Sequence, residues 1–141
     1  MKIKVLNKTD LNSDIQNQIS KLFIQLSANK KQLELAEIIL PENPITLVYC
    51  EENGIVLGIA SMCHYKVISG NKGWIEDVVV DSNQRGKGIG KKLVKKLIEI
   101  GSHMNLSEIL LFTEDHRVQA ISLYTKLGFK LKESRIYTFK F

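Results

Sequence analysis

The stretch from Trp74 to Met104 constrains the fold of this 141-residue chain more than any other. Its first part, Ile75 to Val80, is largely β-branched, which favours a strand inside a sheet. Three glycines then follow within five positions, at Gly86, Gly88 and Gly90, and such a run lets the backbone approach a ligand closely. Apolar residues then recur at helical spacing, with lysines on the other face. The pattern predicts a strand, a glycine-rich turn and an amphipathic helix.

A glycine-rich turn that opens a helix is an anion site, because free N–H groups and the helix dipole both point at the ligand. Arg85 and Lys87 add positive charge there, so we expect a phosphate ligand, in particular a diphosphate. Two common phosphate loops do not fit. A Walker A loop would need glycine in place of Arg85 and serine or threonine in place of Lys92, and the dinucleotide fingerprint would need glycine in place of Lys91.

Composition and charge limit the classes of protein to which the chain can belong. With 141 residues, of which 44% are hydrophobic, we expect one globular domain over residues 1–141. No apolar run is long enough for a membrane span. Cys50 and Cys63 lie in apolar runs and are interpreted as buried free thiols, so we expect a cytoplasmic protein. The net charge of +5 is compatible with nucleic acid, an acidic membrane or a phosphorylated ligand, and the basic residues beside the glycines favour the last.

Before the Trp74 strand, hydrophobic periodicity predicts a strand, two helices and two antiparallel strands, at residues 3–6, 14–28, 32–40, 45–50 and 55–67. Ser13, with Gln16 three residues later, is expected to cap the first helix. Asn53-Gly54 between two apolar runs is a strong hairpin signal, and Gly58 indicates a bulge.

After the lysine-rich helix, the sequence predicts a buried strand, a second amphipathic helix and two final strands, at residues 109–113, 117–127, 129–132 and 136–141. A helix connects the Trp74 strand to the strand at 109–113, so these two strands are expected to be parallel. Gly128 is positioned to end the amphipathic helix.

Two motifs together resemble the GCN5-related N-acetyltransferase (GNAT) superfamily. The first is Arg85-Gly86-Lys87-Gly88-Ile89-Gly90, which fits Arg-x-x-Gly-x-Gly. The second runs from Ala120 to Phe129 and matches Ala-x-x-Phe/Leu-Tyr-x-Lys-x-Gly-Phe, although Arg117 stands where the family commonly has Asn. The strand IEDVVVD is locally most similar to the glucosamine-phosphate N-acetyltransferase branch. The likeness covers about residues 74–129.

The resemblance implies a mixed α/β (α+β) fold in three layers, with a mostly antiparallel sheet of six to seven strands, a splayed parallel pair and about four flanking helices. It also implies acetyl-CoA as the cofactor, gripped at its pyrophosphate by the glycine-rich loop and at its acetyl-pantetheine group by the strand backbone. The implied cofactor-binding residues are Val78, Val79, Val80, Arg85, Gly86, Lys87, Gly88, Ile89, Gly90, Lys91, Arg117, Tyr124 and Lys126.

Transfer of an acetyl group from a thioester to an amine needs an acid, a base and donors for the negative charge on the carbonyl oxygen. The resemblance places Tyr124 as the general acid, and a neutral phenol suits that role; a core-facing aromatic is the alternative. Glu76 in an apolar strand is the candidate base, because burial would raise its pKa; the alternatives are a substrate contact or an outward-facing acid.

Asp77 would point to the opposite face from Glu76 in a regular strand, but a bulge would break that alternation. His64 and His116 are further alternatives for the base, whereas His103 is expected at the surface. No spacing of His, Cys and Asp suggests a metal site.

The leading hypothesis is an acetyl-CoA-dependent N-acetyltransferase in which a primary amine attacks directly in a ternary complex. The acceptor can be a small amine, an amino sugar or a protein amine. The rival is a catalytically silent acyl-CoA-binding module, or a basic domain that binds nucleic acid through its lysine helix. Glu76 and Tyr124 separate the two, because a mere binder requires neither. No membrane or nucleic-acid partner is expected, and the sequence leaves open whether the protein is a homodimer.

Overall fold

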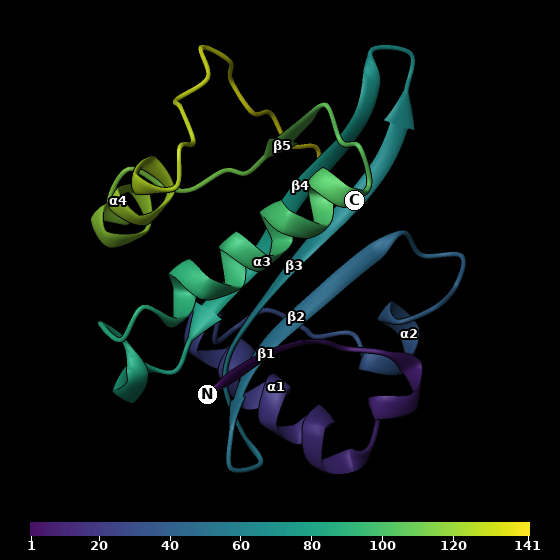
Figure 1. Ribbon diagram of the computed structural model, residues 1–141, viewed down its shortest axis with the longest axis vertical. Helices are drawn as coiled ribbons and strands as arrows, with labels where there is room; N and C mark the ends of the chain where they lie inside the picture. Colours follow the sequence, from purple (N-terminus) through teal and green to yellow (C-terminus); the bar gives the residue numbers. More distant parts are fainter.

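The computed structural model describes all 141 residues and contains one five-stranded sheet (Figure 1). The strands lie in the order β1-β2-β3-β4-β5 across the sheet. Their bounds are β1 Lys2–Val5, β2 Ile45–Glu52, β3 Ile55–Val67, β4 Gly70–Val80 and β5 Glu108–Leu110. The first four strands pair antiparallel, whereas β5 pairs parallel with β4. The predicted mixed sheet with one parallel pair is therefore confirmed.

Helices cover both faces of this sheet, with α1 on one face and α3 on the other (Figure 1). Their bounds are α1 Ser13–Leu26, α2 Leu35–Ile38, α3 Ile89–His103 and α4 Val118–Lys126, with short 3₁₀ turns at η1 Lys8–Asp10 and η2 Ser82–Gln84. None of these helices combines the length and the hydrophobicity that a membrane crossing would need.

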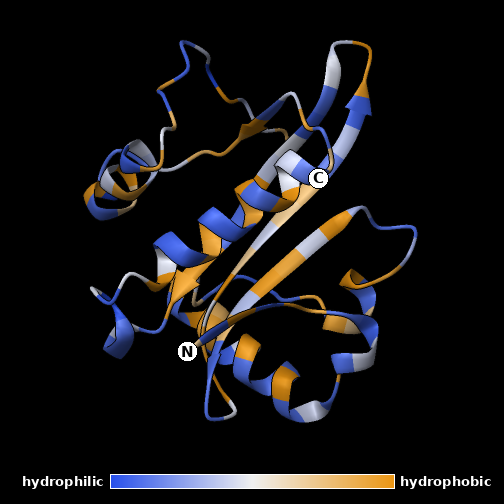
Figure 2. Ribbon diagram, in the orientation of Figure 1, coloured by the Kyte–Doolittle hydropathy of each residue, from blue (hydrophilic) through white to orange (hydrophobic).

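Two apolar cores lie on opposite faces of the sheet, because successive strand residues point to opposite sides. Leu47 joins the core under α1, together with Ile19 and Leu22. The next residue, Val48, joins the core under α3, which includes Leu93. Figure 2 shows apolar segments that recur between polar ones along both helices, and the buried residues of each helix belong to the core beneath it. Burial on both faces holds the central strands rigid enough to position a site.

The β2–β3 hairpin follows the prediction closely. Asn53 and Gly54 form its two-residue turn with φ of 52° and 77°, which is the left-handed geometry that such hairpins require. The register shifts opposite Gly58, so the predicted bulge is confirmed. A side chain at Gly58 would place its Cβ 3.0 Å from the carbonyl oxygen of Val79, which explains the glycine.

The strand count is five rather than six to seven. The strands predicted at 129–132 and 136–141 do not form, and the strand predicted at 109–113 is limited to Glu108–Leu110. A strand persists only where a neighbour takes its N–H and C=O groups, and the β4–β5 ladder ends at Trp74 and Leu110. With so short an edge, the tail (residues 129–141) stays unpaired.

Two helix ends also differ from the prediction. Asn12, not Ser13, caps α1, because its Oδ1 accepts the N–H of Ile15 at 2.9 Å. The second helix is only Leu35–Ile38, shorter than the predicted 32–40. The backbone N–H of Leu35 donates to Gln16 Oε1 at 2.8 Å, so side chains from α1 and the loop replace helical hydrogen bonds there.

Candidate active site

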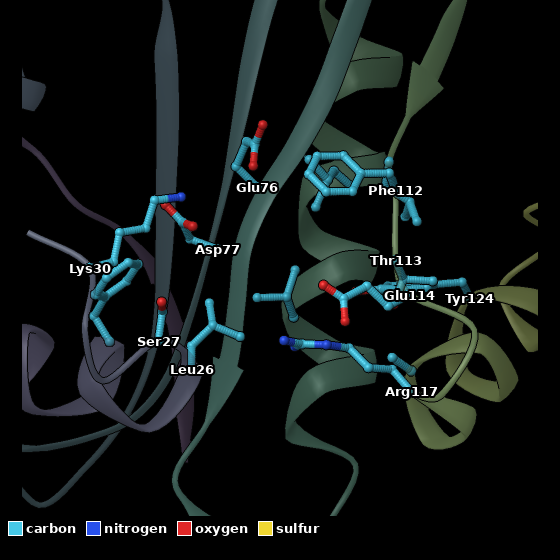
Figure 3. A pocket seen from close by; sticks show the side chains of 15 residues that line it. Leu26, Ser27, Lys30, Glu76, Asp77, Phe112, Thr113, Glu114, Arg117 and Tyr124 are labelled. Carbon is cyan, nitrogen blue, oxygen red and sulfur yellow. The ribbon is translucent and has the colours of Figure 1, made fainter. Parts of the chain in front are cut away.

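Strands β4 and β5 part after a short pairing. The ladder joins Lys72–Trp74 to Glu108–Leu110 and stops, while β4 continues to Val80. The predicted splay of the parallel pair at its C-terminal end is therefore confirmed. A pocket lies in the opening, between Ile75–Val78 of β4 and the segment Leu111–Glu114 (Figure 3).

A bulge in β4 brings two acidic residues to this pocket. Opposite β3, Ile59 pairs with Val79 and Ser61 with Glu76, so one residue of β3 faces two of β4. Asp77 takes a φ of 52° at this point, in a region that few non-glycine residues adopt. Both Glu76 and Asp77 line the pocket as a result. The sequence analysis kept Asp77 as a candidate site residue only if β4 contained a bulge, and the bulge is present.

Burial raises the pKa of both carboxyl groups above the ordinary range. The negative charge of Asp77 raises the pKa of Glu76 further, whereas the ammonium of Lys30 lowers the pKa of both. Asp77 is exposed as a residue, yet partial burial of its carboxyl group is the main cause of its raised pKa. Carboxyl groups with raised pKa are stronger bases than exposed ones, which suits proton abstraction from an amine.

Tyr124 of α4 lines the opposite wall of the pocket (Figure 3). Its ring packs edge-on against Phe129, with 5.9 Å between the ring centroids. Burial raises the pKa of Tyr124, and the nearby charge of Arg117 opposes this shift. The phenol therefore stays protonated at neutral pH and can donate a proton. Arg117 stands at the N-terminal end of α4 and also lines the pocket.

The glycine-rich turn follows η2 and opens α3. Gly86 and Gly88 have φ of 79° and 77°, and no atom lies within 4 Å of where a Cβ would stand at either position. The first N–H of α3 seen to donate is that of Lys92, to the Gly88 carbonyl at 3.1 Å. No side chain caps the helix, so the earlier N–H groups are left for a ligand. This bare, open backbone fits a pyrophosphate.

Two of the basic side chains beside the turn brace it. Arg85 Nε donates to the Val80 carbonyl at 3.3 Å, which ties the turn to the end of β4. Lys87 Nζ donates to Gln84 Oε1 at 2.7 Å. Lys91 is exposed and makes no ion pair. Their charge still lies beside the turn, where an anion would bind.

The predicted cofactor residues divide into four groups in space. Val78, Arg117 and Tyr124 line the pocket. Val79 and Ile89 are buried, at 4% and 1% exposure, so only their backbone can meet a ligand. Lys126 lies at the end of α4 and does not line the pocket. The residues of the glycine-rich turn do not line the pocket, and the turn lies beyond the C-terminal end of β4, between η2 and α3 (Figure 1).

The histidines do not contribute to the pocket. His64 lies on β3 and lines neither this pocket nor its neighbour. His116 is exposed, with its Nδ1 3.2 Å from Glu114 Oε2. His103 is at the surface as predicted, and its Nδ1 lies 2.8 Å from the Glu99 carbonyl. The carboxylates that line the pocket are the remaining candidates for a base, namely Glu76 and Asp77 on β4 and Glu114 after β5.

Several pocket residues carry no motif that sequence reasoning could have used. Phe23, Ser27 and Lys30 come from α1 and the loop after it, and Phe112 comes from the segment after β5. Phe23 lies in the helix that hydrophobic periodicity predicts, where an apolar residue by itself does not indicate a site. On the side of the pocket near α1, the neighbouring acids Glu76 and Asp77 of β4 were the only residues that the sequence singled out.

An opening between neighbouring parallel strands gives an extended ligand access to the middle of a sheet. The sequence resemblance implied this arrangement for N-acetyltransferases, and the structure contains it. The fold is therefore that of an acetyltransferase.

Comparison with known proteins supplies the family. Residues 14–129 match the model of the Acetyltransferase (GNAT) family, and the chain belongs to this family. Over 140 residues the chain is 29% identical to a glucosamine 6-phosphate N-acetyltransferase of Trypanosoma brucei brucei, a match that covers 96% of this chain and 93% of that one.

Solved structures share the fold along nearly the whole chain. Glucosamine-6-phosphate N-acetyltransferase from Arabidopsis thaliana has a TM-score of 0.79 and 26% identity, over 99% of each chain. AAC(6′)-Iy in complex with the bisubstrate analogue CoA-S-monomethyl-acetylneamine has a TM-score of 0.80 and 20% identity, over 99% of this chain and 97% of that one. At that identity, the second likeness concerns the fold alone.

Proposed function

We propose that this protein transfers an acetyl group from acetyl-CoA to a primary amine, by direct attack in a ternary complex. One observation carries the proposal: the parted strands hold a pocket that Glu76 and Asp77 line from one wall and Tyr124 from another. A base and an acid are thereby available on opposite sides of one cavity. Residues 1–141 would then form a single N-acetyltransferase domain.

Acetyl-CoA supplies an acetyl group activated as a thioester. Glu76 or Asp77 takes the proton of the attacking amine, directly or through a water molecule. The hydroxyl of Tyr124 donates its proton to the departing sulfur. Backbone N–H groups on the edge of β4 beyond Trp74, which β5 leaves unpaired, stabilise the negative charge on the carbonyl oxygen. Each step uses a group that already lies at the opening.

The cofactor would run from this pocket to the glycine-rich turn. Val78, Val79 and Val80 contribute backbone groups along β4, and Arg117 and Tyr124 contribute side chains from α4. At the other end, the N–H groups of residues 86–91 take the pyrophosphate. Arg85, Lys87 and Lys91 add positive charge there. Lys126, at the end of α4, would contact a part of the cofactor outside the pocket.

The acceptor we favour is a small-molecule amine, with an amino sugar as the first candidate. The support is the relative from Trypanosoma brucei brucei that is named for glucosamine 6-phosphate and matches nearly the whole chain. Both cysteines are free, Cys50 buried and Cys63 half-buried. Free thiols persist in reducing compartments, which supports a cytoplasmic location.

The test is an acceptor screen that measures CoA thiol release and the mass of the product together. We expect release that depends on the amine, with one N-acetyl product formed for each CoA released. Tight acetyl-CoA binding without transfer to any amine would favour the silent module. Salt-sensitive nucleic-acid binding without affinity for CoA would favour the basic interaction domain.

We also propose that the protein forms a homodimer. The tail exposes large apolar side chains, namely Leu131, Ile136, Tyr137, Phe139 and Phe141. Exposed apolar groups gathered in one segment are typical of association surfaces. Light scattering during gel filtration should give twice the 16.0 kDa of one chain, and the mass of a single chain across the concentration range would contradict the proposal.

A further inference from the structure

A second hollow adjoins the active-site pocket on the α1 side of the sheet. The two share Phe23, Lys30 and Asp77 as lining residues, so they adjoin each other at these side chains. The walls of the second hollow are largely apolar and come from α1, α2 and strands β2 and β3. A ligand in this hollow would have one end at Asp77, beside the place where the acetyl group is transferred.

The charges of this hollow are few and mostly positive. Its only charged lining residues are Lys30, Lys31 and Asp77. Neither lysine lies within ion-pair distance of a carboxylate. Lys30 lies close enough to lower the pKa of Asp77, whereas Lys31 has no such effect on Asp77 or Glu76. The positive charge of Lys31, in particular, is left for a ligand.

The loop that carries both lysines is held in place by hydrogen bonds to α1. Gln32 Nε2 donates to the Ser20 carbonyl at 3.0 Å. On the far side of the loop, the Leu35 N–H donates to Gln16 Oε1 at 2.8 Å. The same glutamine donates through Nε2 to Ser20 Oγ at 3.0 Å, so its amide is already engaged. Lys30 and Lys31, both exposed as residues, are therefore the charged donors among the lining side chains that a ligand can still reach.

We propose that the acceptor is a small amine that also carries an anionic group, a carboxylate or a phosphate, and that Lys30 and Lys31 bind this group. The inference rests on the proposed function. The amine of such a molecule would lie at Asp77 and Glu76, while its anion meets the lysines. A polycationic amine is disfavoured, because its further positive charges would meet Lys30 and Lys31.

The test compares acceptors in matched pairs that differ only in the anion. Glucosamine 6-phosphate against glucosamine tests a phosphate, and an amino acid against its carboxamide tests a carboxylate. The wild-type protein should show kcat/KM at least about 10-fold higher for the anionic member of one pair, since hydrogen bonds to charged groups are the strong ones. The pair that shows the difference identifies the anion.

Lys31 is the diagnostic position, because it lies in the hollow without lining the active-site pocket. Lys31→Gln should lower kcat/KM for the anionic acceptor by about 5- to 30-fold and leave its neutral partner nearly unchanged. Lys31→Glu should lower it further. In both Lys31 variants, the KM for acetyl-CoA and the pH dependence of kcat/KM should stay as in wild type. Lys95→Gln, on the exposed face of α3, is the matched control and should match wild type.

The outcomes separate this inference from the proposed function. Equal use of both members of each pair, or an equal loss for both members in Lys31→Gln, would overturn the anion site while acetyl transfer stands. Transfer to no amine at all would overturn the proposed function, and the anion site with it. Discrimination that weakens as salt is raised would support an electrostatic origin.

Discussion

At the scale of single residues, the site depends on one irregular position in β4. Asp77 leaves the regular strand conformation at φ 52°, and this bulge lets two successive acids line one cavity. Their proximity matters chemically, because the charge of Asp77 raises the pKa of Glu76. Two coupled carboxyl groups can divide the roles of base and substrate contact between them.

The first prediction concerns Asp77→Asn. Asparagine tolerates a positive φ, so the bulge should persist. If Glu76 is the base, the change removes a charge that raises its pKa, and the acid limb of the kcat/KM profile should move to lower pH. The charges of Lys30, Glu114 and Arg117 around the pocket stay in place. The measurement is a pH–rate profile at saturating acetyl-CoA.

The raised pKa of Asp77 also predicts how Asp77→Asn changes the stability of the fold. A carboxyl group with a raised pKa in the folded protein stabilises the fold most at low pH, and this contribution is lost as pH rises through the folded pKa. Asp77→Asn should therefore not lower the Tm at pH 7. If instead kcat falls by about 10²–10⁴-fold, Asp77 is the base. A fully active variant with an unmoved acid limb would exclude both roles.

The second prediction concerns Tyr124→Phe. The change removes the hydroxyl and keeps the ring that packs on Phe129, so acetyl-CoA affinity and thermal stability should hold. If the phenol protonates the sulfur, kcat should fall by about 10²–10⁴-fold. The measurement is turnover with a true acceptor, under conditions where chemistry limits the rate.

Tyr65→Phe is its matched control, because Tyr65 lies on β3 and lines neither pocket. This control should keep wild-type turnover. Turnover of Tyr124→Phe within a few-fold of wild type would mean that Tyr124 is only a packed aromatic residue.

At the scale of elements, α3 and the turn before it combine two functions. The apolar face of α3 fills the core with Leu93, Val94 and Leu97, each at 0% exposure. Its N-terminus presents backbone N–H groups at the glycine-rich turn. Gly90 allows α3 to approach α4, since a Cβ there would lie 3.3 Å from Leu123 Cδ2. The core therefore fixes the orientation of the glycine-rich turn relative to the wall that carries Tyr124.

The third prediction tests the turn with a matched pair of glycines. Gly88 and Gly54 both have φ 77° and nothing within 4 Å of a would-be Cβ. Alanine at either position should therefore cost a similar amount of stability, about 1–2 kcal/mol. Only Gly88→Ala places a methyl group where the pyrophosphate is expected, so only this variant should lose acetyl-CoA affinity, by at least about 10-fold. Calorimetry measures the affinities, and equal affinities in both variants would refute the phosphate loop.

Much of this element structure could be predicted from sequence, because periodicity reports burial directly. The apolar spacing of α1 and α3, the Asn53-Gly54 turn and the glycine-rich turn all depend on local chemistry. The two final strands could not be predicted in the same way. The alternation of Tyr137, Phe139 and Phe141 is typical of a strand, but pairing depends on an available edge, and β5 offers only Glu108–Leu110.

The residues of the candidate site that stand in short sequence motifs could be predicted, whereas those placed by long-range packing could not. Glu76, Tyr124 and the glycines stand in recognisable motifs. The place of Asp77 depends on the register between β3 and β4, and Lys30 reaches the pocket only through the packing of α1 on the sheet. Neither contact leaves a pattern in the residues around it. Long-range packing therefore decides which residues complete the site.

At the scale of the whole molecule, the two cores hold the sheet from both faces while its last strand pair parts. The opening adjoins a hollow under α1 and α2 on one side and faces α4 on the other. An acyl donor and an amine can thus approach the same point from different directions. This arrangement is what a ternary-complex transfer requires.

The most direct test of this account is a crystal structure of the protein with acetyl-CoA. We predict the acetyl group between Ile75–Val78 of β4 and the segment 111–113, with its sulfur beside the Tyr124 hydroxyl. The pyrophosphate should accept hydrogen bonds from the backbone of residues 86–91. Acetyl-CoA bound on the exposed lysine face of α3, or an acetyl group outside the opening between β4 and β5, would contradict the account.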